Sequence, residues 1–149
     1  MLFRTPAQKA DLKWSWERWD RAFFAAGACH VLAHEFLKTE AGRAFHPVMI
    51  LPDAGFRGGH VFCSDGAIVF DYHGFSTHDP YVAHFMRKIT RFFPGWRGQF
   101  LDITDTFWTN DWFKACQHRR PEQYYRDPTE RARRFIDRHH STQRLRASA

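Results

Sequence analysis

Apolar residues recur at helical spacing in the first part of the chain. Between Asp11 and Ala26 they follow three- and four-residue steps, which predicts a helix that carries Leu12, Trp16, Trp19 and Phe23. Gly27 ends this helix. Cys29 then begins a second predicted helix, CHVLAHEFLKTEAG, whose C-terminal signal is Gly42.

The pattern changes to short apolar runs in the middle of the chain. Pro47–Leu51 (PVMIL) has the length of a strand, and a loop with three glycines, PDAGFRGG, follows it. The runs HVFCS and AIVFD flank an Asp-Gly dipeptide, which predicts a β-hairpin over His60–Asp71. The rest of the chain is expected to form the helix Asp79–Phe93, the strand Trp96–Ile103 and the helices Thr106–Gln117 and Asp127–His140.

The register of this hairpin links two residues that can carry chemistry. If the Asp-Gly dipeptide at 65–66 forms the turn, His60 lies directly across from Asp71, with their Cβ atoms about 4.5–5.5 Å apart. Phe62 and Val69 share that face of the hairpin, and the other face carries Val61, Cys63, Ile68 and Phe70. A slip of one residue would send His60 and Asp71 to opposite faces, so their proximity depends on the register.

Composition supports a folded domain. The chain has 149 residues, of which 44% are hydrophobic and 17% aromatic, and this is more ring surface than a disordered chain carries. We therefore predict a single α+β domain over residues 1–149, in which the helix that begins at Cys29 packs on a small antiparallel sheet. Residues 127–149 are expected to form a basic C-terminal helix and tail.

The formal net charge of +6 is unevenly distributed. Residues 114–149 contain ten Lys/Arg and four Asp/Glu, whereas the first 113 residues contain twelve of each sign. The sequence therefore assigns the basic character to the C-terminal segment and not to the part of the chain that holds Cys29, His60 and Asp71.

A cysteine needs a lowered pKa to act as a nucleophile, since the free thiol has a pKa of about 8.5. Cys29 stands at a predicted helix start, where free N–H groups favour negative charge. His60 follows a flexible glycine pair and can supply an imidazolium, and Asp71 can hold that imidazole in one orientation. These residues predict a cysteine-nucleophile site.

The segments GACHVLAHEFL, GGHVF and DG…VFDYHG, within residues 16–75, resemble the papain-like and transglutaminase-like superfamily. The resemblance implies a papain-like (transglutaminase-like) fold and a thiol-dependent acyl-transfer or hydrolytic enzyme, such as a peptidase, amidase or deamidase. It makes Cys29 the nucleophile, His60 the general base and acid, and Asp71 the residue that orients the histidine. The implied substrate is a peptide, a protein or a small amide, and neither a metal nor a cofactor is implied.

The chain departs from that superfamily before the cysteine, where papain-like peptidases carry a glutamine that donates to the oxyanion. The corresponding stretch, WDRAFFAAGA, has neither Gln nor Asn. The Cys29 backbone N–H then needs a second donor, for which the Trp19 indole or a side chain from the later chain is the candidate. Gly59 and His73 are weaker candidates for substrate binding. The departure counts against ordinary proteolysis more than against thiol chemistry.

Cysteine usage and hydropathy bear on the compartment. Three widely spaced cysteines without a CxxC pair favour a reducing compartment, so a cytoplasmic protein is expected. Export as an effector, by a signal that the sequence does not reveal, is the alternative. No apolar run reaches the ~18 residues of a membrane span, and the first residues lack the apolar core of a secretory signal, so no membrane association is expected.

Structural interpretations of the same residues stay open. Cys29 can be an ordinary core residue, and His60 and Asp71 can be a cross-strand pair that serves only the sheet. His30 and His34 have the spacing of zinc ligands on a helix, but the segment HVLAH lacks the glutamate of the zincin motifs. A zinc site that uses Cys29, His34 or the His60 and Cys63 pair is a further alternative.

Two other classes of function also compete with the enzyme hypothesis. One is a non-catalytic binding or adaptor module of the same fold. The other is a basic nucleic-acid-binding protein that uses residues 114–149. Interspersed Glu130 and Asp137 favour a solvated helix face instead, so nucleic acid is not the expected partner, and an acidic partner is the alternative for this segment.

Overall fold

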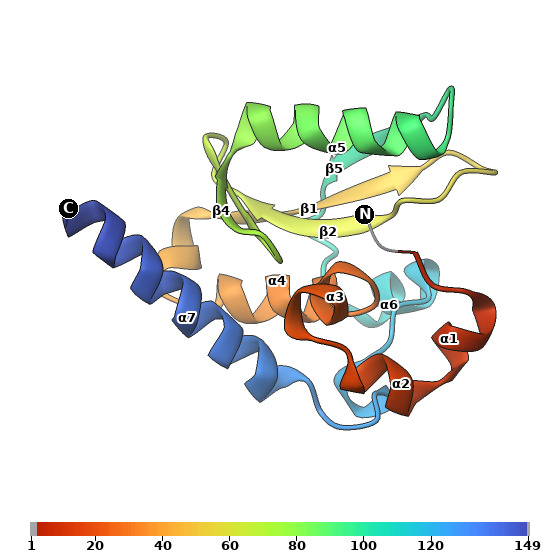
Figure 1. The fold of residues 1–149 in the computed structure, drawn as a ribbon, viewed down its shortest axis with the longest axis horizontal. Helices are drawn as coiled ribbons and strands as arrows, with labels where there is room; N and C mark the ends of the chain where they lie inside the picture. Colours follow the sequence, from red (N-terminus) through yellow and green to blue (C-terminus); the bar gives the residue numbers. More distant parts are fainter. Residues whose placement is uncertain (1–2, 149) are drawn as a thin grey trace.

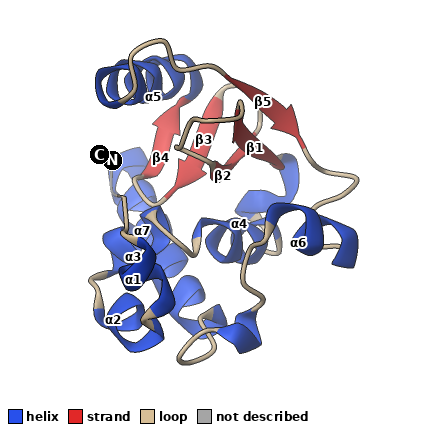
Figure 2. Ribbon diagram, turned by 90° about the vertical axis from the view of Figure 1, so that its right-hand side faces the viewer, coloured by secondary structure: helices blue, strands red, loops and turns tan. Residues whose placement is uncertain are grey.

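A five-stranded antiparallel sheet separates the protein into layers (Figure 1). The computed structural model describes residues 3–148, and describes side chains for residues 3–139. The strands have the order β4-β3-β2-β1-β5 and are β1 (His46–Pro52), β2 (His60–Ser64), β3 (Ile68–Asp71), β4 (Gly74–Thr77) and β5 (Gly98–Asp102). Figure 2 shows helix α5 (His78–Phe92) on one face of the sheet and α4 (Cys29–Leu37) on the other.

The remaining helices lie on the α4 side of the sheet (Figure 1). They are α1 (Pro6–Ala10), α2 (Leu12–Glu17), α3 (Asp20–Ala25), α6 (Asn110–Cys116) and α7 (Thr129–Ser148), with the short 3-10 helices η1 (Ala41–Ala44) and η2 (Pro121–Gln123). The predicted α+β class is confirmed, as is the packing of the helix that begins at Cys29 on an antiparallel sheet. Among the described residues, no helix combines the length and the apolar character needed to cross a membrane.

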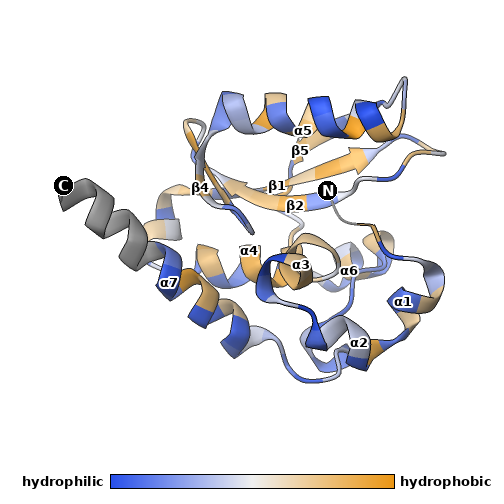
Figure 3. Cartoon of the chain, viewed as in Figure 1, coloured by the Kyte–Doolittle hydropathy of each residue, from blue (hydrophilic) through white to orange (hydrophobic). Residues whose placement is uncertain are grey.

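Alternation along the hairpin strands gives the sheet two apolar faces. Toward α4 the hairpin presents Val61, Cys63 and Phe70. Toward α5 it presents Phe62 and Val69. These are the two faces that the period-two pattern predicted. Figure 3 shows apolar and polar residues interspersed along α5. Its apolar residues, Tyr81, Phe85 and Ile89 among them, pack against this second face, so each face of the sheet is covered by a different set of helices.

The predicted register of the hairpin is wrong by two residues. Ser64 pairs with Val69, and the Asp65 backbone N–H donates to the Ile68 carbonyl at 3.1 Å, so the turn is centred on residues 66–67. The Asp65 carboxylate causes this shift, because it accepts the backbone N–H groups of Ala67 and Ile68 at 2.8 and 2.6 Å.

A shift of two residues preserves the face on which each side chain lies, because the side chains of a strand alternate with a period of two. His60 and Asp71 therefore stay on one face, as predicted, but as diagonal rather than directly opposed neighbours. Diagonal neighbours have Cα atoms about 7–8 Å apart, a distance that a histidine ring can span.

The predicted helix over residues 11–26 is interrupted, because α2 ends at Glu17 and α3 begins at Asp20. The Arg131 guanidinium binds the backbone carbonyls of Trp16 and Arg18, each at 2.6 Å, and so takes acceptors that a continuous helix would use itself.

Other boundaries also differ from the prediction. Strand β4 was not predicted; Gly74, with φ +86°, reverses the chain after Asp71 and brings β4 alongside β3. Helix α4 ends at Leu37 rather than near Gly42. The backbone of α7 continues beyond the predicted end at His140, and the last residue of the predicted tail, Ala149, lies outside the described residues.

Candidate active site

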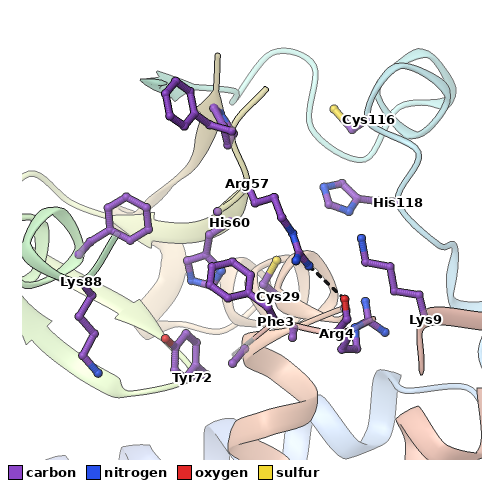
Figure 4. Close-up of a pocket in the computed structure, with 18 of the residues that line it drawn as sticks. Phe3, Arg4, Lys9, Cys29, Arg57, His60, Tyr72, Lys88, Cys116 and His118 are labelled. Atoms are coloured by element: carbon purple, nitrogen blue, oxygen red, sulfur yellow. Dashed lines mark hydrogen bonds between the residues drawn. The ribbon is translucent and has the colours of Figure 1, made fainter. Parts of the chain in front are cut away.

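Cys29 stands at the N-terminus of α4, beside the edge of the sheet where β2 begins and β3 ends. Gly27, with φ +119°, separates α3 from α4, and the Arg4 guanidinium lies so close that a Cβ at this position would be 2.7 Å from it. The Cys29 side chain is buried, with 7% of the residue exposed, and lines a cavity of about 510 Å³ together with His60 (Figure 4). The thiol is therefore shielded but reachable.

The His60 and Asp71 side chains are in direct contact. His60 Nε2 lies 3.1 Å from Asp71 Oδ2, and both side chains are buried. Because Nε2 is bound to the carboxylate, Nδ1 is the ring nitrogen available to the Cys29 sulfur. The Cys29 and His60 side chains line the same cavity and lie close enough for each to shift the pKa of the other, so His60 links the sulfur to the carboxylate.

Asp71 is held by two further residues that donate to it. The Tyr81 hydroxyl of α5 donates to Oδ2 at 2.7 Å. The His73 backbone N–H donates to Oδ1 at 2.8 Å, and His73 Nδ1 lies 3.0 Å from the same oxygen. A buried carboxylate needs such donors to stay ionised, so these contacts keep Asp71 charged and hold it in place.

The pKa shifts at the site follow from these contacts. Burial alone would raise the pKa of Cys29, but the neighbouring His30 and His60 side chains and the charge on His60 hold it well below its ordinary value. Burial would lower the pKa of His60, but hydrogen bonds to Asp71 and Cys29 raise it to about 10. The pKa of Asp71, which burial would raise, is held far below its usual range by His60 and His73. The favoured state is thiolate, imidazolium and carboxylate.

His30 is a second histidine beside the sulfur. Its ring is fully buried and stacks on His118, with ring centroids 4.5 Å apart. His30 Nε2 lies 2.7 Å from the Arg119 carbonyl, which accepts its proton. Within the described part of the chain, His30 Nδ1 has no conventional hydrogen-bond partner. The sequence indicated His30 only as a metal ligand, because its contact with the sulfur depends on the side-chain rotamers of the helix start.

The structure brings Cys29, His60 and Asp71 together, and it places the weaker candidates as follows. Gly59 and His73 line the same cavity. Trp19 does not line it; the residue is 67% exposed at the start of α3. The prediction that the Trp19 indole donates to the oxyanion is therefore wrong, because the break between α2 and α3 leaves this side chain facing solvent.

The structure also adds site residues that the sequence did not indicate. Tyr81 gave no local signal, since its role depends on where α5 lies over the sheet. The prediction that the basic residues lie away from the site is wrong, because five cationic side chains line the cavity: Arg4, Lys9, Arg57, Lys88 and Arg119.

The residues weighed as metal ligands have other contacts. His34 stacks on Trp108, with ring centroids 3.7 Å apart, and burial lowers its pKa to about 4. Cys63 is fully buried in the core on the α4 side, and its thiol lies 3.6 Å from the Ala33 carbonyl. In the part of the chain that the structure describes, no group of three or more His, Cys, Asp or Glu side chains could hold a metal ion.

Comparisons with known proteins add no relative. No family model, curated protein or solved structure matches the chain. The geometry of the site therefore carries the functional argument.

Proposed function

We propose that this protein is a thiol-dependent acyl-transfer or hydrolytic enzyme, of the peptidase, amidase or deamidase type, with Cys29 as its nucleophile. The supporting observation is that buried His60 shares a cavity with Cys29, whose pKa it lowers, while its Nε2 lies 3.1 Å from Asp71 Oδ2. A helix that begins at the cysteine and packs on an antiparallel sheet also supports a papain-like or transglutaminase-like fold.

The reaction starts from the thiolate. Cys29 Sγ attacks the carbonyl carbon, an S–C bond forms, and the carbonyl oxygen becomes an oxyanion. The oxyanion then collapses, the C–N bond breaks, and the His60 imidazolium gives its proton to the departing nitrogen. In the second half, neutral His60 takes a proton from water or an acceptor amine, which attacks the thioester. The S–C bond breaks and the thiolate returns.

Asp71 acts through His60 rather than on the substrate. Its contact with His60 Nε2 leaves Nδ1 as the ring nitrogen available to the sulfur, and its negative charge favours the imidazolium. Tyr81 and His73 hold the carboxylate in turn, so they are positioning residues. A histidine fixed in this way transfers protons without first having to reorient.

The oxyanion can be bound by the helix start and by the later chain. The first N–H groups of a helix have no partners within the helix, so the Cys29 backbone N–H is the first donor. Gln117 and His118 line the same cavity and come from the segment after α6. Burial lowers the pKa of His118 to about 4, so this ring is neutral near pH 7 and keeps an N–H to donate. These side chains replace Trp19 as candidates for the second donor.

Alkylation with iodoacetamide across pH tests the nucleophile. At pH 6 an ordinary thiol is less than about 1% thiolate, whereas Cys29 is expected to be ionised, so it should react about 10²-fold faster than Cys116. Cys63 and Cys116 are internal controls, because burial raises the pKa of both thiols. Mass spectrometry of peptides reports each cysteine separately.

Variants of the histidine complete this test. His60→Ala is expected to remove the advantage of Cys29 at pH 6, since the imidazolium that stabilises the thiolate is lost. His60→Lys keeps a positive charge but not the position of the imidazole ring, so it should restore only part of the faster reaction of Cys29 at pH 6. A folded wild-type protein in which Cys29 reacts no faster than Cys116 at any pH would contradict the proposed function.

A further inference from the structure

The cavity beside Cys29 is lined by five cationic side chains that come from separate parts of the chain. Arg4 precedes α1, Lys9 is in α1, Arg57 is in the loop before β2, Lys88 is in α5, and Arg119 follows α6. The described residues that line the cavity include no Asp or Glu. This accumulation of one sign is a property of the folded chain, since the first 113 residues carry equal numbers of each charge.

Backbone carbonyls hold part of this cluster in place. An Arg57 guanidinium nitrogen donates to the Arg4 carbonyl at 3.0 Å, and Arg119 donates to the Lys9 carbonyl. Figure 4 shows the Arg57 side chain extending toward Arg4. A carbonyl fixes the position of a cation but leaves its full charge uncompensated. Over the described residues, no ion pair joins any of the five cations to a carboxylate.

The cations on the N-terminal side of the cavity repel one another. Burial lowers the pKa of Lys9, and the charges of Arg57, Arg4 and Arg119 lower it further. Burial and Arg119 likewise lower the pKa of Arg4. The charge of Cys29 offsets part of this repulsion at Arg4, and a bound anion would relieve the rest.

We propose that the substrate of this site is anionic, with a carboxylate or phosphate group beside the carbonyl that Cys29 attacks. The proposal rests on the proposed function and adds the class of substrate. Arg4, Lys9, Arg57 and Arg119 would bind the anionic group, and Lys88 faces the cavity from α5. A cavity of about 510 Å³ accommodates a small molecule or a few side chains of a peptide.

Two alkylating reagents that differ in charge test the proposal. Iodoacetate and iodoacetamide undergo the same reaction: a bond forms between the cysteine sulfur and the CH2 carbon of the reagent, and the C–I bond breaks as iodide leaves. Only iodoacetate is an anion. The measured quantity is the ratio of their rate constants at Cys29, divided by the same ratio for N-acetylcysteinamide as an uncharged reference thiol. At low ionic strength this normalised ratio is expected to be about 10 or more, and at high salt it is expected to fall toward 1.

Neutral variants identify the cations responsible. Arg57→Gln and Lys9→Gln are each expected to lower the normalised ratio roughly three- to fivefold, the effect of one charge at short range in a partly hydrated site. Arg97→Gln and Arg87→Gln are matched controls, because both side chains are exposed and neither lines the cavity. Since the His60 imidazolium is present in every variant, its attraction for iodoacetate cancels from the comparison.

Protection by simple anions tests the same point in the unmodified protein. Inorganic phosphate and glutarate are each added before iodoacetamide, and the ion that slows alkylation of Cys29 more strongly identifies the preferred anionic group. Protection by neither ion counts against the proposal, as does a normalised ratio near unity that Arg57→Gln leaves unchanged. Both results are distinct from failure of the proposed function, in which Cys29 does not react with iodoacetamide either.

Discussion

Two groups of basic residues in this protein have opposite surroundings. In α7, the arginines lie against carboxylates: Arg131 and Arg138 bind Asp20, Arg133 pairs with Glu35, and Arg134 pairs with Glu130. The cavity cations have no such partners among the described residues, and two of them, Arg57 and Arg119, donate to backbone carbonyls instead. The sequence shows the first group as the conspicuous charge excess, yet the second group surrounds the candidate nucleophile.

The contrast shows that a count of charges along the chain does not locate an electrostatic site. The Arg131 side chain is only 13% exposed, and it binds Asp20 at 2.8 Å while it also caps backbone carbonyls at the break after α2. Its role is structural, which weakens the alternative of a nucleic-acid-binding helix. Cations without carboxylate partners are those left available for a ligand.

The largest expected effect tests the paired group. Arg131→Ala should lower the free energy of unfolding by about 3 kcal/mol, because it removes one of the two arginines that bind Asp20 and leaves the Trp16 and Arg18 carbonyls without their donor. Arg134→Ala is the matched control on the same helix: its side chain is 63% exposed, and its contact with Glu130 is 3.4 Å long. That control should lose no more than about 0.5 kcal/mol. Urea unfolding measures both, and equal losses would contradict a structural role for Arg131.

The second prediction concerns the thiolate, an anion that the cavity cations face. The raised pKa of His60 stabilises the fold below the unfolded histidine value of about 6.5, and this contribution is lost as the pH rises above it. The lowered pKa of Cys29 stabilises the fold above the unfolded cysteine value of about 8.5, and this contribution is lost as the pH falls. Between about pH 6.5 and 8.5 the two changes cancel, so the wild-type stability should stay level.

Cys29→Ser removes the thiol titration and part of the support for the charged form of His60, whose pKa Asp71 still raises. The stability of this variant should therefore fall as the pH rises above about 6.5, by up to about 1.4 kcal/mol per pH unit, until the pH reaches the reduced pKa of His60. Urea unfolding at intervals across this range compares the variant with the wild type, and Cys116→Ser serves as the control that keeps the level profile. Parallel profiles for all three proteins would mean that Cys29 is not a thiolate in the folded state.

A smaller effect is expected at Tyr81, which holds the buried carboxylate. Tyr81→Phe should cost about 1.5 kcal/mol, the loss of a hydrogen bond to a charged acceptor. It should also move the pH dependence of Cys29 alkylation upward, because Asp71 then orients His60 less firmly. Tyr72→Phe is the control for stability, since the Tyr72 hydroxyl makes no hydrogen bond with another described residue. An unchanged alkylation profile in Tyr81→Phe would limit this residue to a structural role.

The smallest effect returns to the unpaired cations. Lys9→Gln should leave the stability unchanged or raise it by up to about 1 kcal/mol, because an exposed charge is strongly screened and only repulsion is removed. Inorganic phosphate should raise the unfolding midpoint of the wild type and of Arg87→Gln. It should raise the midpoint of Lys9→Gln by a smaller amount. A clear loss of stability in Lys9→Gln, with an unchanged response to phosphate, would show that Lys9 belongs with the paired, structural group.

The local features of the site could be predicted from the sequence. The start of a helix at Cys29 follows from the glycine before it and the apolar spacing after it. The common face of His60 and Asp71 follows from strand alternation, and it survived a turn that lies one residue further along than predicted. A displacement of the turn by one residue shifts the register by two. The predicted face of each side chain was therefore right, although the predicted cross-strand partners were wrong.

The sequence alone thus determined the element types, the order of Cys29, His60 and Asp71, and the face that two of them share, because these depend on neighbours along the chain. Only the tertiary structure decided that Tyr81 reaches Asp71, that Trp19 faces solvent, and which basic residues are paired. Hydrogen bonds and charge interactions depend on distances of a few ångströms between segments far apart in the sequence. A one-dimensional pattern does not contain those distances.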